Sequence, residues 1–569
     1  MRRDNESMSL RGAAQQRRGN LQCNGKSNNE EIASTPTGSR NDIVVIGSGI
    51  AGLSAALHLA ERGLRPLILE ADPNYLGGRL AGGETVEVDG YQFRLEHGVH
   101  GIWSQYRNLQ AMLARHNLRP VFVPAEEETW IYRSGGFLGR ADVGSAIRRS
   151  PFPPPLHYLA LFLRPRFLWM LDIRDWVSLV RTWAGLVMAI GIDPFAESQP
   201  LEGLTLGQMT RKWSPALRAF FLGLARNGLS SHPDEVPMSG FIAFLRFYTL
   251  LRRDAWVFSY LPEDGGTSIC EPLGDRVRQL GGSIRFGARV TRVARQGSEW
   301  LVTWETAEGQ ASAHAGQVIL ATDSQNAQNI LQASFGEQKL FFPRSLSNAI
   351  VRLWFDTPPR RARPPSRADA FAGRAAGSAG QAGGAEAGVF TGEFTLHNYF
   401  WLDRLYNPFR RWARETGGSA LEAHIYGPDE VLVQPDAVLL AQAIQDVQAA
   451  WPELRGHRIY GHIQRNPATH TLPAVGPDDK HLGTVTLWEG LFCAGDWVRH
   501  PAPAFFLERA CLTGIEAANA VLEARGLATW PTLPYLPPEP FAAWIEYLMQ
   551  RGRRRVREKR GKSTRDEQR

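Results

Sequence analysis

The stretch DIVVIGSGIAGLSAALHLAERGLRPLILE, residues 42–70, decides the fold class. An apolar run over residues 43–46 predicts a buried strand, and a glycine-rich turn then leads into an apolar helix that ends at Gly63. A second apolar run over residues 67–69 ends in Glu70. This order of strand, turn, helix and strand predicts the first unit of a Rossmann-type nucleotide-binding domain.

Each glycine in the turn Gly47-Ser48-Gly49-Ile50-Ala51-Gly52 has a mechanical role. Gly47 permits the tight turn, Gly49 lets the backbone approach a pyrophosphate, and Gly52 lets the helix pack against the strand. Ile50 and Ala51 begin the helix, whose free N–H groups and positive dipole end attract phosphates. We therefore predict that this turn binds a dinucleotide.

Glu70 completes the nucleotide-binding pattern. It stands 23 residues after Gly47, where an acidic side chain accepts hydrogen bonds from the adenosine ribose. A glycine-rich turn that served packing alone would not account for this residue. The unit does not by itself distinguish NAD from FAD.

A second glycine turn, Gly77-Gly78-Arg79, follows almost at once. It resembles the Gly-Gly-Arg motif of flavoproteins of the amine oxidase and phytoene desaturase superfamily. The resemblance implies that FAD is the cofactor, with Gly78 against its phosphate and ribityl region and Arg79 donating a charge-assisted hydrogen bond. The alternative is an ordinary turn with an exposed arginine.

The C-terminal part resembles the closing flavin motif of the same superfamily. Residues 491–497 read LFCAGDW, and residues 505–519 form a predicted helix. The resemblance implies that Gly495 and Asp496 bind the ribityl chain and that the helix start stabilises the reduced flavin. It also implies two further matches: a strand that holds the adenine at Val290 and the sequence ILATD at residues 319–323.

Three segments resemble the carotenoid-acting branch, and most of all the ring-aromatising carotene desaturase/methyltransferases of the isorenieratene synthase type. They are residues 93–109, residues 392–426 and residues 508–514. The sequence departs from the family pattern in having Glu96 where aspartate is usual and an extra insert at 361–388. Ordinary phytoene desaturases more often read Glu-Gly-Ala where this chain has Glu508-Arg509-Ala510. The resemblance implies desaturation of a carotenoid, or aromatisation of its end ring with migration of a methyl group.

Such a reaction passes a hydride to FAD and then needs a base for a proton. Glu96 and His97 follow an alternating strand and emerge at its end, so we rank them first. The strand places Tyr91, Phe93 and Leu95 on one face. Structural roles remain open for every candidate, and Arg509 pairs with Glu508 or with the flavin. The full set of candidate bases or cation stabilisers is Glu96, His97, His100, Glu422, His424 and Glu508.

The charge of the chain is concentrated at its ends. The 569 residues carry a net charge of +7, residues 551–569 alone hold ten basic and three acidic residues, and residues 1–40 add +3. The body is therefore slightly acidic, which argues against a nucleic-acid partner. We expect both ends to be disordered and the basic tail to be attracted to an anionic membrane surface.

Aromatic and basic residues alternate through residues 151–192, which favours a helix pair lying in the headgroup layer of a membrane. The alternative is a core helix with an arginine-rich solvent face. No stretch has the roughly 18–20 apolar residues of a spanning helix. The partners that we expect are an apolar carotenoid, a membrane surface and an electron acceptor that is a quinone or oxygen.

Four scattered cysteines without a Cys-x-x-Cys pair argue against a metal or disulfide scaffold and favour a reducing compartment. The first 40 residues show no apolar signal region. We therefore expect no metal and a cytoplasmic protein peripheral to the membrane.

The pattern as a whole predicts an α/β fold in which a Rossmann-type, glutathione reductase-like FAD-binding domain is interleaved with a mixed α+β substrate domain. The expected order is a disordered tail at 1–40, FAD-binding segments at 41–125, 261–345 and 483–528, a helical substrate- or membrane-facing segment at 126–260, a substrate-domain segment at 346–482 with a low-complexity insert at 361–388, and a C-terminal extension with a basic tail at 529–569.

Three other interpretations stay open at this stage. The first is a linear carotene desaturase, or an amine-oxidase-like flavoenzyme for another apolar substrate. The second is a flavin-binding carrier of carotenoid or lipid without catalysis. The third is a protein that binds NAD(P) alone.

Overall fold

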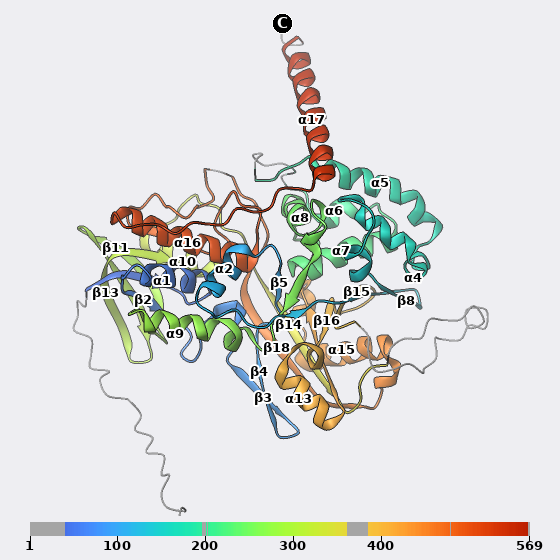
Figure 1. The fold of residues 1–569 in the computed structure, drawn as a ribbon, viewed down its shortest axis with the longest axis horizontal. Coiled ribbons are helices and arrows are strands. Elements are labelled where there is room, and N and C mark those ends of the chain that lie inside the picture. Colours follow the sequence, from blue (N-terminus) through green and yellow to red (C-terminus); the bar gives the residue numbers. More distant parts are fainter. Residues whose placement is uncertain (1–39, 196–200, 202, 361–384, 478, 567–569) are drawn as a thin grey trace, which may run out of the picture.

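The computed structural model describes residues 40–195, 201, 203–360, 385–477 and 479–566 (Figure 1). The predicted N-terminal tail therefore lies outside the described residues except for Arg40, which begins the first strand. Most of the predicted insert also lies outside them. Its last residues, Ala387 and Gly388, belong to a buried strand, so the insert ends earlier than predicted.

The nucleotide-binding sheet has the order β10-β2-β1-β13-β12-β11. Strand β19 also pairs with β13, at residues 318–320, beyond the part of β13 that pairs with β12. Its pairs are parallel from β10 to β13 and at β19, and antiparallel where β11, β12 and β13 form a meander. This is the predicted Rossmann-type arrangement. The strands are β1 (Arg40–Ile46), β2 (Pro66–Leu69), β10 (Ser283–Arg285), β11 (Arg289–Gln296), β12 (Glu299–Thr306), β13 (Gly309–Leu320) and β19 (Leu491–Cys493).

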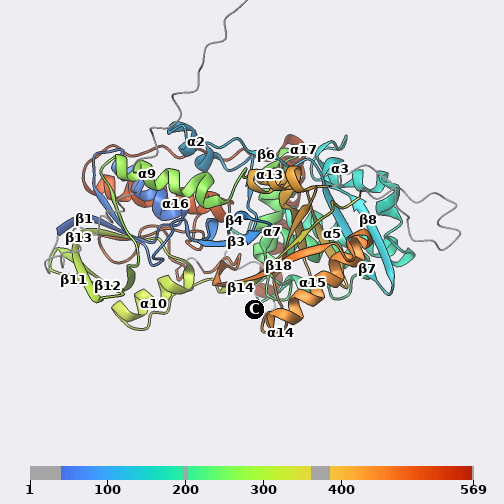
Figure 2. The ribbon, with the colours of Figure 1, turned by 90° about the horizontal axis from the view of Figure 1, so that it is seen from below.

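Alternation along β1 divides the core into two layers. Ile43 and Val45 pack with helices on one face of the sheet, whereas Val44 and Ile46 pack with the meander and one helix on the other. Figure 2 shows helices on both sides of this sheet. The helices of the first face are α1 (Ile50–Ala60), α9 (Glu271–Gln279) and α16 (Phe506–Ala524), with α2 (Arg107–Arg115) packed against α16, and the helix of the second face is α10 (Ser324–Phe335).

A second sheet has the order β18-β14-β17-β16-β15-β7-β8. Its neighbours run antiparallel except for β15 and β7. Helix α15 (Asp436–Ala450) covers one face, and α7 (Pro215–Leu229) contacts β15 on the other. The strands are β7 (Glu128–Ser134), β8 (Phe137–Asp142), β14 (Ser345–Phe355), β15 (Ala387–Gly392), β16 (Asn398–Trp401), β17 (Ser419–Ile425) and β18 (Arg458–Thr471).

Smaller elements connect the two sheets. A ribbon pairs β3 (Glu84–Val88) with β4 (Tyr91–Leu95), and a three-stranded sheet has the order β5-β9-β6. Phe93 and Leu95 are buried as the alternation predicts, and Tyr91 is half-buried. The remaining strands and helices are β5 (Gly101–Trp103), β6 (Val123–Pro124), β9 (Phe258–Tyr260), α3 (Gly144–Arg148), α4 (Pro165–Leu168), α5 (Ile173–Ile190), α6 (Leu206–Thr210), α8 (Met238–Leu245), α12 (Leu402–Leu405), α13 (Asn407–Thr416), α14 (Asp429–Leu432) and α17 (Pro540–Asp566).

The C-terminal tail corrects a prediction, because its backbone is helical as far as Asp566. Helix α17 projects from the body as a rod (Figure 1). The part of α17 nearest the body packs against α5. Ala542 is fully buried, and Glu546 pairs with Arg246 at 2.5 Å. The basic residues that suggested disorder are also good helix formers. The contacts of Ala542 and Glu546 with the body hold the first turns of the helix, from which it continues. Within the described residues no helix is long and apolar enough to cross a bilayer.

Candidate functional site

The first glycine turn has the geometry that its sequence predicts. Gly47 has a φ of +98°, and its N–H donates to the carbonyl of Leu69 at 2.8 Å. A Cβ on Gly52 would lie 2.0 Å from the Gly47 carbonyl oxygen, so only glycine permits this contact. A Cβ on Gly49 would meet no atom within 4 Å, so the space beside it is open to a ligand.

Glu70 directly follows β2 and lines the same cavity. Its carboxylate accepts hydrogen bonds from the Ser48 N–H at 2.9 Å and from the Asp72 N–H at 2.8 Å. Its carbonyl accepts from Ala288, which brings the predicted adenine strand at Val290 to the cavity wall. The structure therefore brings the predicted ribose and adenine contacts together.

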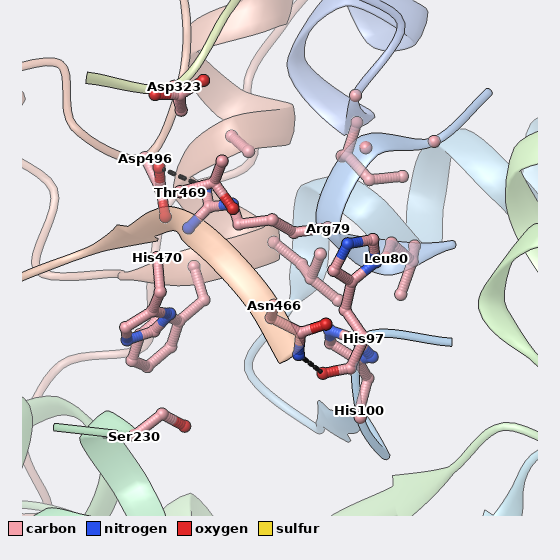
Figure 3. A pocket seen from close by; sticks show the side chains of 18 of the residues that line it. Arg79, Leu80, His97, His100, Ser230, Asp323, Asn466, Thr469, His470 and Asp496 are labelled. Carbon is pink, nitrogen blue, oxygen red and sulfur yellow. Dashed lines mark hydrogen bonds and ion pairs between the residues drawn. The ribbon is translucent and has the colours of Figure 1, made fainter. Parts of the chain in front are cut away.

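The second glycine turn lies against the first. The Gly77 N–H donates to the Ser48 carbonyl at 3.0 Å, and a Cβ on Gly78 would lie 3.5 Å from the Cα of Gly49. Arg79 crosses from this turn to Asp496, and the ion pair is 2.7 Å long (Figure 3). Burial alone would raise the pKa of Asp496, but the Arg79 guanidinium holds it below its ordinary value. Asp496 is therefore a carboxylate.

Gly495 and Asp496 stand between β19 and α16. Gly495 has a φ of +146°, and its N–H donates to the Thr513 hydroxyl of α16 at 2.9 Å. Phe506, the first residue of α16, lines the cavity. Both the carboxylate and the positive end of the helix dipole therefore face the same space, as the closing motif implies.

These residues surround a cavity of about 660 Å³. One part of its wall comes from the nucleotide-binding sheet, and the other comes from the second sheet, the three-stranded sheet and helices such as α8. The second part is rich in aromatic rings, among them Trp103, Trp130, Phe244, Trp256, Phe258 and Phe400. The cavity therefore joins a polar region at the glycine turns to an aromatic region.

His97 and His100 line the cavity where the two regions meet (Figure 3). The Nδ1 atom of His97 lies 2.5 Å from the carbonyl of Ala81, which fixes its proton on Nδ1 and leaves Nε2 as an acceptor. Burial lowers the pKa of His97, so this ring is neutral near pH 7. In His100, Nδ1 lies 3.8 Å from a carboxylate oxygen of Glu96.

Glu96 itself does not line the cavity. Its carboxylate is almost fully buried, accepts the Gly265 N–H at 2.7 Å and accepts the hydroxyl of Tyr406. Burial raises its pKa above the ordinary value. These contacts favour a role in fixing the loop that carries His97 over the direct catalytic role that we ranked first.

Glu508 and Arg509 also lie away from the cavity wall. Glu508 is fully buried and accepts the N–H groups of Asn108 and Leu109, at 2.9 and 3.1 Å, so it caps α2. Arg509 borders a small neighbouring pocket and donates to the carbonyl of Ala502 at 3.1 Å. The geometry thus favours structural roles for both, and Arg509 does not pair with Glu508.

A buried set of polar residues on the second sheet went partly unrecognised. Glu422 and His424 were candidates, but Arg352, Asn398 and Tyr426 were not. Asn398, His424 and Tyr426 line the cavity, and Glu422 bonds both His424 and Arg352. Glu422, His424 and Tyr426 are each two residues apart, and this spacing could have indicated that they share one face of a strand.

Comparisons with known proteins identify related sequences. The family model described as flavin containing amine oxidoreductase matches residues 50–522. A carotenoid phi-ring synthase of Chlorobaculum tepidum is 26% identical over 93% of this chain and 95% of its own length. A carotenoid phi-ring synthase of Streptomyces griseus is 27% identical over 88% and 91%. The 15-cis-phytoene desaturase of Arabidopsis thaliana is 25% identical over 48% of each chain.

Solved structures support the fold. Cyclohexylamine oxidase from Brevibacterium oxydans aligns with a TM-score of 0.57 and 17% identity, over 85% of this chain and 99% of that one. A putrescine oxidase mutant aligns with a TM-score of 0.59 and 15% identity, over 86% and 100%. Both alignments extend over nearly the whole of the solved chain, so the two-sheet architecture is shared as a unit.

Proposed function

Because the chain belongs to the family of flavin-containing amine oxidoreductases, we propose that it aromatises an end ring of a carotene, with migration of a methyl group. It is an FAD-dependent oxidoreductase of the carotenoid desaturase branch. The observation that carries the finer proposal is the match to two carotenoid phi-ring synthases along nearly their whole length. The phytoene desaturases match either over about half of the chain, as that of Arabidopsis thaliana does, or over 85% of it at a lower identity of 22%, as that of Glycine max does.

The cavity fits FAD at its polar end. The open space beside Gly49 suits a pyrophosphate, Glu70 suits the adenosine ribose, and the Asp496 carboxylate suits the ribityl hydroxyls. When bound there, FAD supplies the hydride acceptor of the reaction. The chain contributes the donors and acceptors that fix its position.

The aromatic part of the cavity supports a polyene substrate. Loss of a hydride from an allylic carbon leaves a positive charge on the polyene, and the faces of Trp103, Trp256 and Phe400 are suited to stabilise such a charge. A ring carbon that carries two methyl groups cannot enter an aromatic ring, so one methyl must migrate between two rounds of hydride and proton loss. Groups able to accept these protons line the same cavity, among them His97 and His100.

Expression in carotene-accumulating cells tests this proposal. A blue-shifted product spectrum and new aromatic ring signals are expected. An extended conjugated chain would instead identify a linear desaturase. Unchanged pigment, together with a yellow purified protein that no carotene reduces, would identify a carrier. Colourless protein that binds only NAD(P) would refute the assignment of FAD.

We also propose that the protein is cytoplasmic and binds the membrane through one face of α5 and α17. Ile173, Trp176, Val177 and Val180 recur at helical spacing on α5 and are exposed, Ile173 by 80% and Val180 by 74%. Helix α17, which packs against α5, also has exposed apolar or aromatic side chains at helical spacing. They are Trp544, Tyr547 and Leu548.

This face suits entry of an apolar substrate from a bilayer, with the basic end of α17 near anionic headgroups. A quinone in the same bilayer, or oxygen, would take the electrons. Flotation with anionic vesicles tests the proposal. V177S/V180S and removal of residues 551–569 should each weaken binding and leave FAD content intact. Val433, exposed by 79% on the connection after α14, provides the control V433S, which should bind vesicles like the wild type. Equal vesicle binding by the wild type, V177S/V180S and the truncated protein would contradict the proposal.

A further inference from the structure

Three neighbouring strands assemble a polar row at the cavity. In the register of the second sheet, Arg352 of β14 lies opposite Glu422 of β17, and Asn398 of β16 lies opposite His424. Tyr426 follows two residues later, directly after the end of β17. Residues separated by two positions share one face of a strand, so these side chains form a continuous line.

Hydrogen bonds connect this line from the core to the cavity. The Arg352 Nε–H donates to Glu422 Oε2 at 2.7 Å, and His424 Nε2 lies 2.7 Å from Glu422 Oε1. His424 Nδ1 lies 2.5 Å from the hydroxyl oxygen of Tyr426. That oxygen also accepts the amide of Asn398 at 3.1 Å. Tyr426 thus lines the cavity together with His424 and Asn398, and it ends a chain of partners whose other members, Glu422 and Arg352, are buried.

The charges of these partners fix where the protons reside. Burial alone would raise the pKa of Glu422, but Arg352 and His424 lower it to about 2, so Glu422 is a carboxylate. Burial lowers the pKa of His424, which is therefore neutral. Because a carboxylate only accepts hydrogen bonds, His424 must carry its proton on Nε2. Its Nδ1 then accepts a hydrogen bond from the Tyr426 hydroxyl.

We propose that Tyr426, supported by His424 and Glu422, is the group that takes the proton from the oxidised substrate. The inference rests on the proposed function and assigns a catalytic residue to it. It places proton removal on the second sheet, whereas His97 lies on the loop after β4. His424 and Glu422 act through Tyr426 and are positioning residues.

Proton removal follows the loss of the hydride. With its hydride accepted by bound FAD, the substrate would be a cation. A C–H bond next to the cationic carbon breaks, and its electron pair becomes the new double bond. The proton joins Tyr426 Oη while the phenol proton moves to His424 Nδ1. The imidazolium that results donates to Glu422 Oε1, whose other oxygen accepts from Arg352, so the row holds one net positive charge until His424 releases its proton.

Anaerobic reduction of the bound flavin by a carotene tests the proposal, with Y426F as the main variant. A substrate cation that cannot lose its proton regains its hydride, so the flavin of Y426F should remain oxidised. The expected loss in rate is about 100-fold or more, the usual contribution of a general base. The matched control is Y399F, because Tyr399 is a buried tyrosine of β16 that does not line the cavity. Y399F should reduce its flavin at the wild-type rate.

A second measurement does not depend on turnover. In protein labelled with ¹⁵N-histidine, the His424 signal, identified by its loss in H424N, should show a neutral ring protonated at Nε2. The same signal should move in Y426F and not in Y399F. A proton on Nδ1 would overturn the proposal, since His424 would then have no acceptor for the phenol proton.

The outcomes separate this inference from the function on which it rests. If wild type and Y426F are reduced equally fast, the function stands and the role of Tyr426 is refuted. If no carotene reduces the wild-type flavin, the function fails and the inference fails with it. If Y426F alone is slow, keeps its FAD and melts at the wild-type temperature, both are supported.

Discussion

The contrast between Gly49 and Gly52 gives a sharp test of cofactor binding, because the two glycines have opposite surroundings. A Cβ on Gly49 would meet nothing within 4 Å, whereas a Cβ on Gly52 would lie 2.0 Å from the Gly47 carbonyl oxygen and 3.3 Å from a methyl group of Val45. Gly49→Ala should therefore leave the apoprotein intact, and Gly52→Ala should strain it.

The expected magnitudes follow from these contacts. In Gly49→Ala the backbone has an extended conformation that alanine adopts, so the free energy of unfolding of the apoprotein should change by less than about 0.5 kcal/mol. The new methyl group holds the pyrophosphate away from the backbone. Loss of one hydrogen bond to a charged group costs about 1.5–3 kcal/mol, or about 10- to 100-fold in the Kd of FAD. Gly52→Ala should cost about 1–3 kcal/mol of stability even without FAD.

Thermal unfolding of the apoproteins and titration with FAD, followed by flavin fluorescence, measure both effects. The account predicts a normal melt with weak FAD binding for Gly49→Ala and a lowered melt for Gly52→Ala. Wild-type FAD affinity in Gly49→Ala would refute the assignment of the pyrophosphate to this turn. An unchanged melt in Gly52→Ala would refute the close contact between helix and strand.

Three further predictions concern stability. Arg352→Met leaves the buried Glu422 carboxylate without its cationic partner and should cost about 3–5 kcal/mol in urea unfolding. Combining Arg352→Met with Glu422→Gln should recover part of this loss. Burial lowers the pKa of His58 to about 4, so between pH 6.5 and 4 the unfolded chain binds a proton that the folded chain does not. Stability should therefore fall as pH falls through this window, and His58→Gln should flatten the dependence of Tm on pH. Gly514→Ala places a Cβ 2.4 Å from the Ala51 carbonyl oxygen, which should separate α1 from α16 and lower the Tm, whereas an unchanged Tm would show that the helices tolerate the methyl group.

Local sequence predicted the nucleotide-binding half well. The turn at Gly47 and the acidic end at Glu70 lie within one short segment, so their geometry follows from neighbouring residues. The helices and strands around them begin and end within a few residues of their predicted limits. The predicted domain boundaries stay a prediction, although the two sheets do take their strands from interleaved parts of the chain.

The substrate half was harder to predict because its contacts join distant residues. Glu96 and His97 are adjacent in sequence, yet one is buried against Tyr406 and the other faces the cavity. Arg352 meets Glu422 only through the register of two strands 70 residues apart. Composition was misleading for α17. Its charged residues suggested a disordered tail, yet it is a helix whose first turns contact the body.

The central claim is tested most directly by mixing the purified, FAD-loaded protein anaerobically with a ring-bearing carotene and recording the flavin absorbance and the product. The account predicts bleaching of the flavin bands and, after turnover with an added acceptor, a product with an aromatic end ring and a shifted methyl group. Flavin bands that stay oxidised with the carotene and bleach only with dithionite would contradict it.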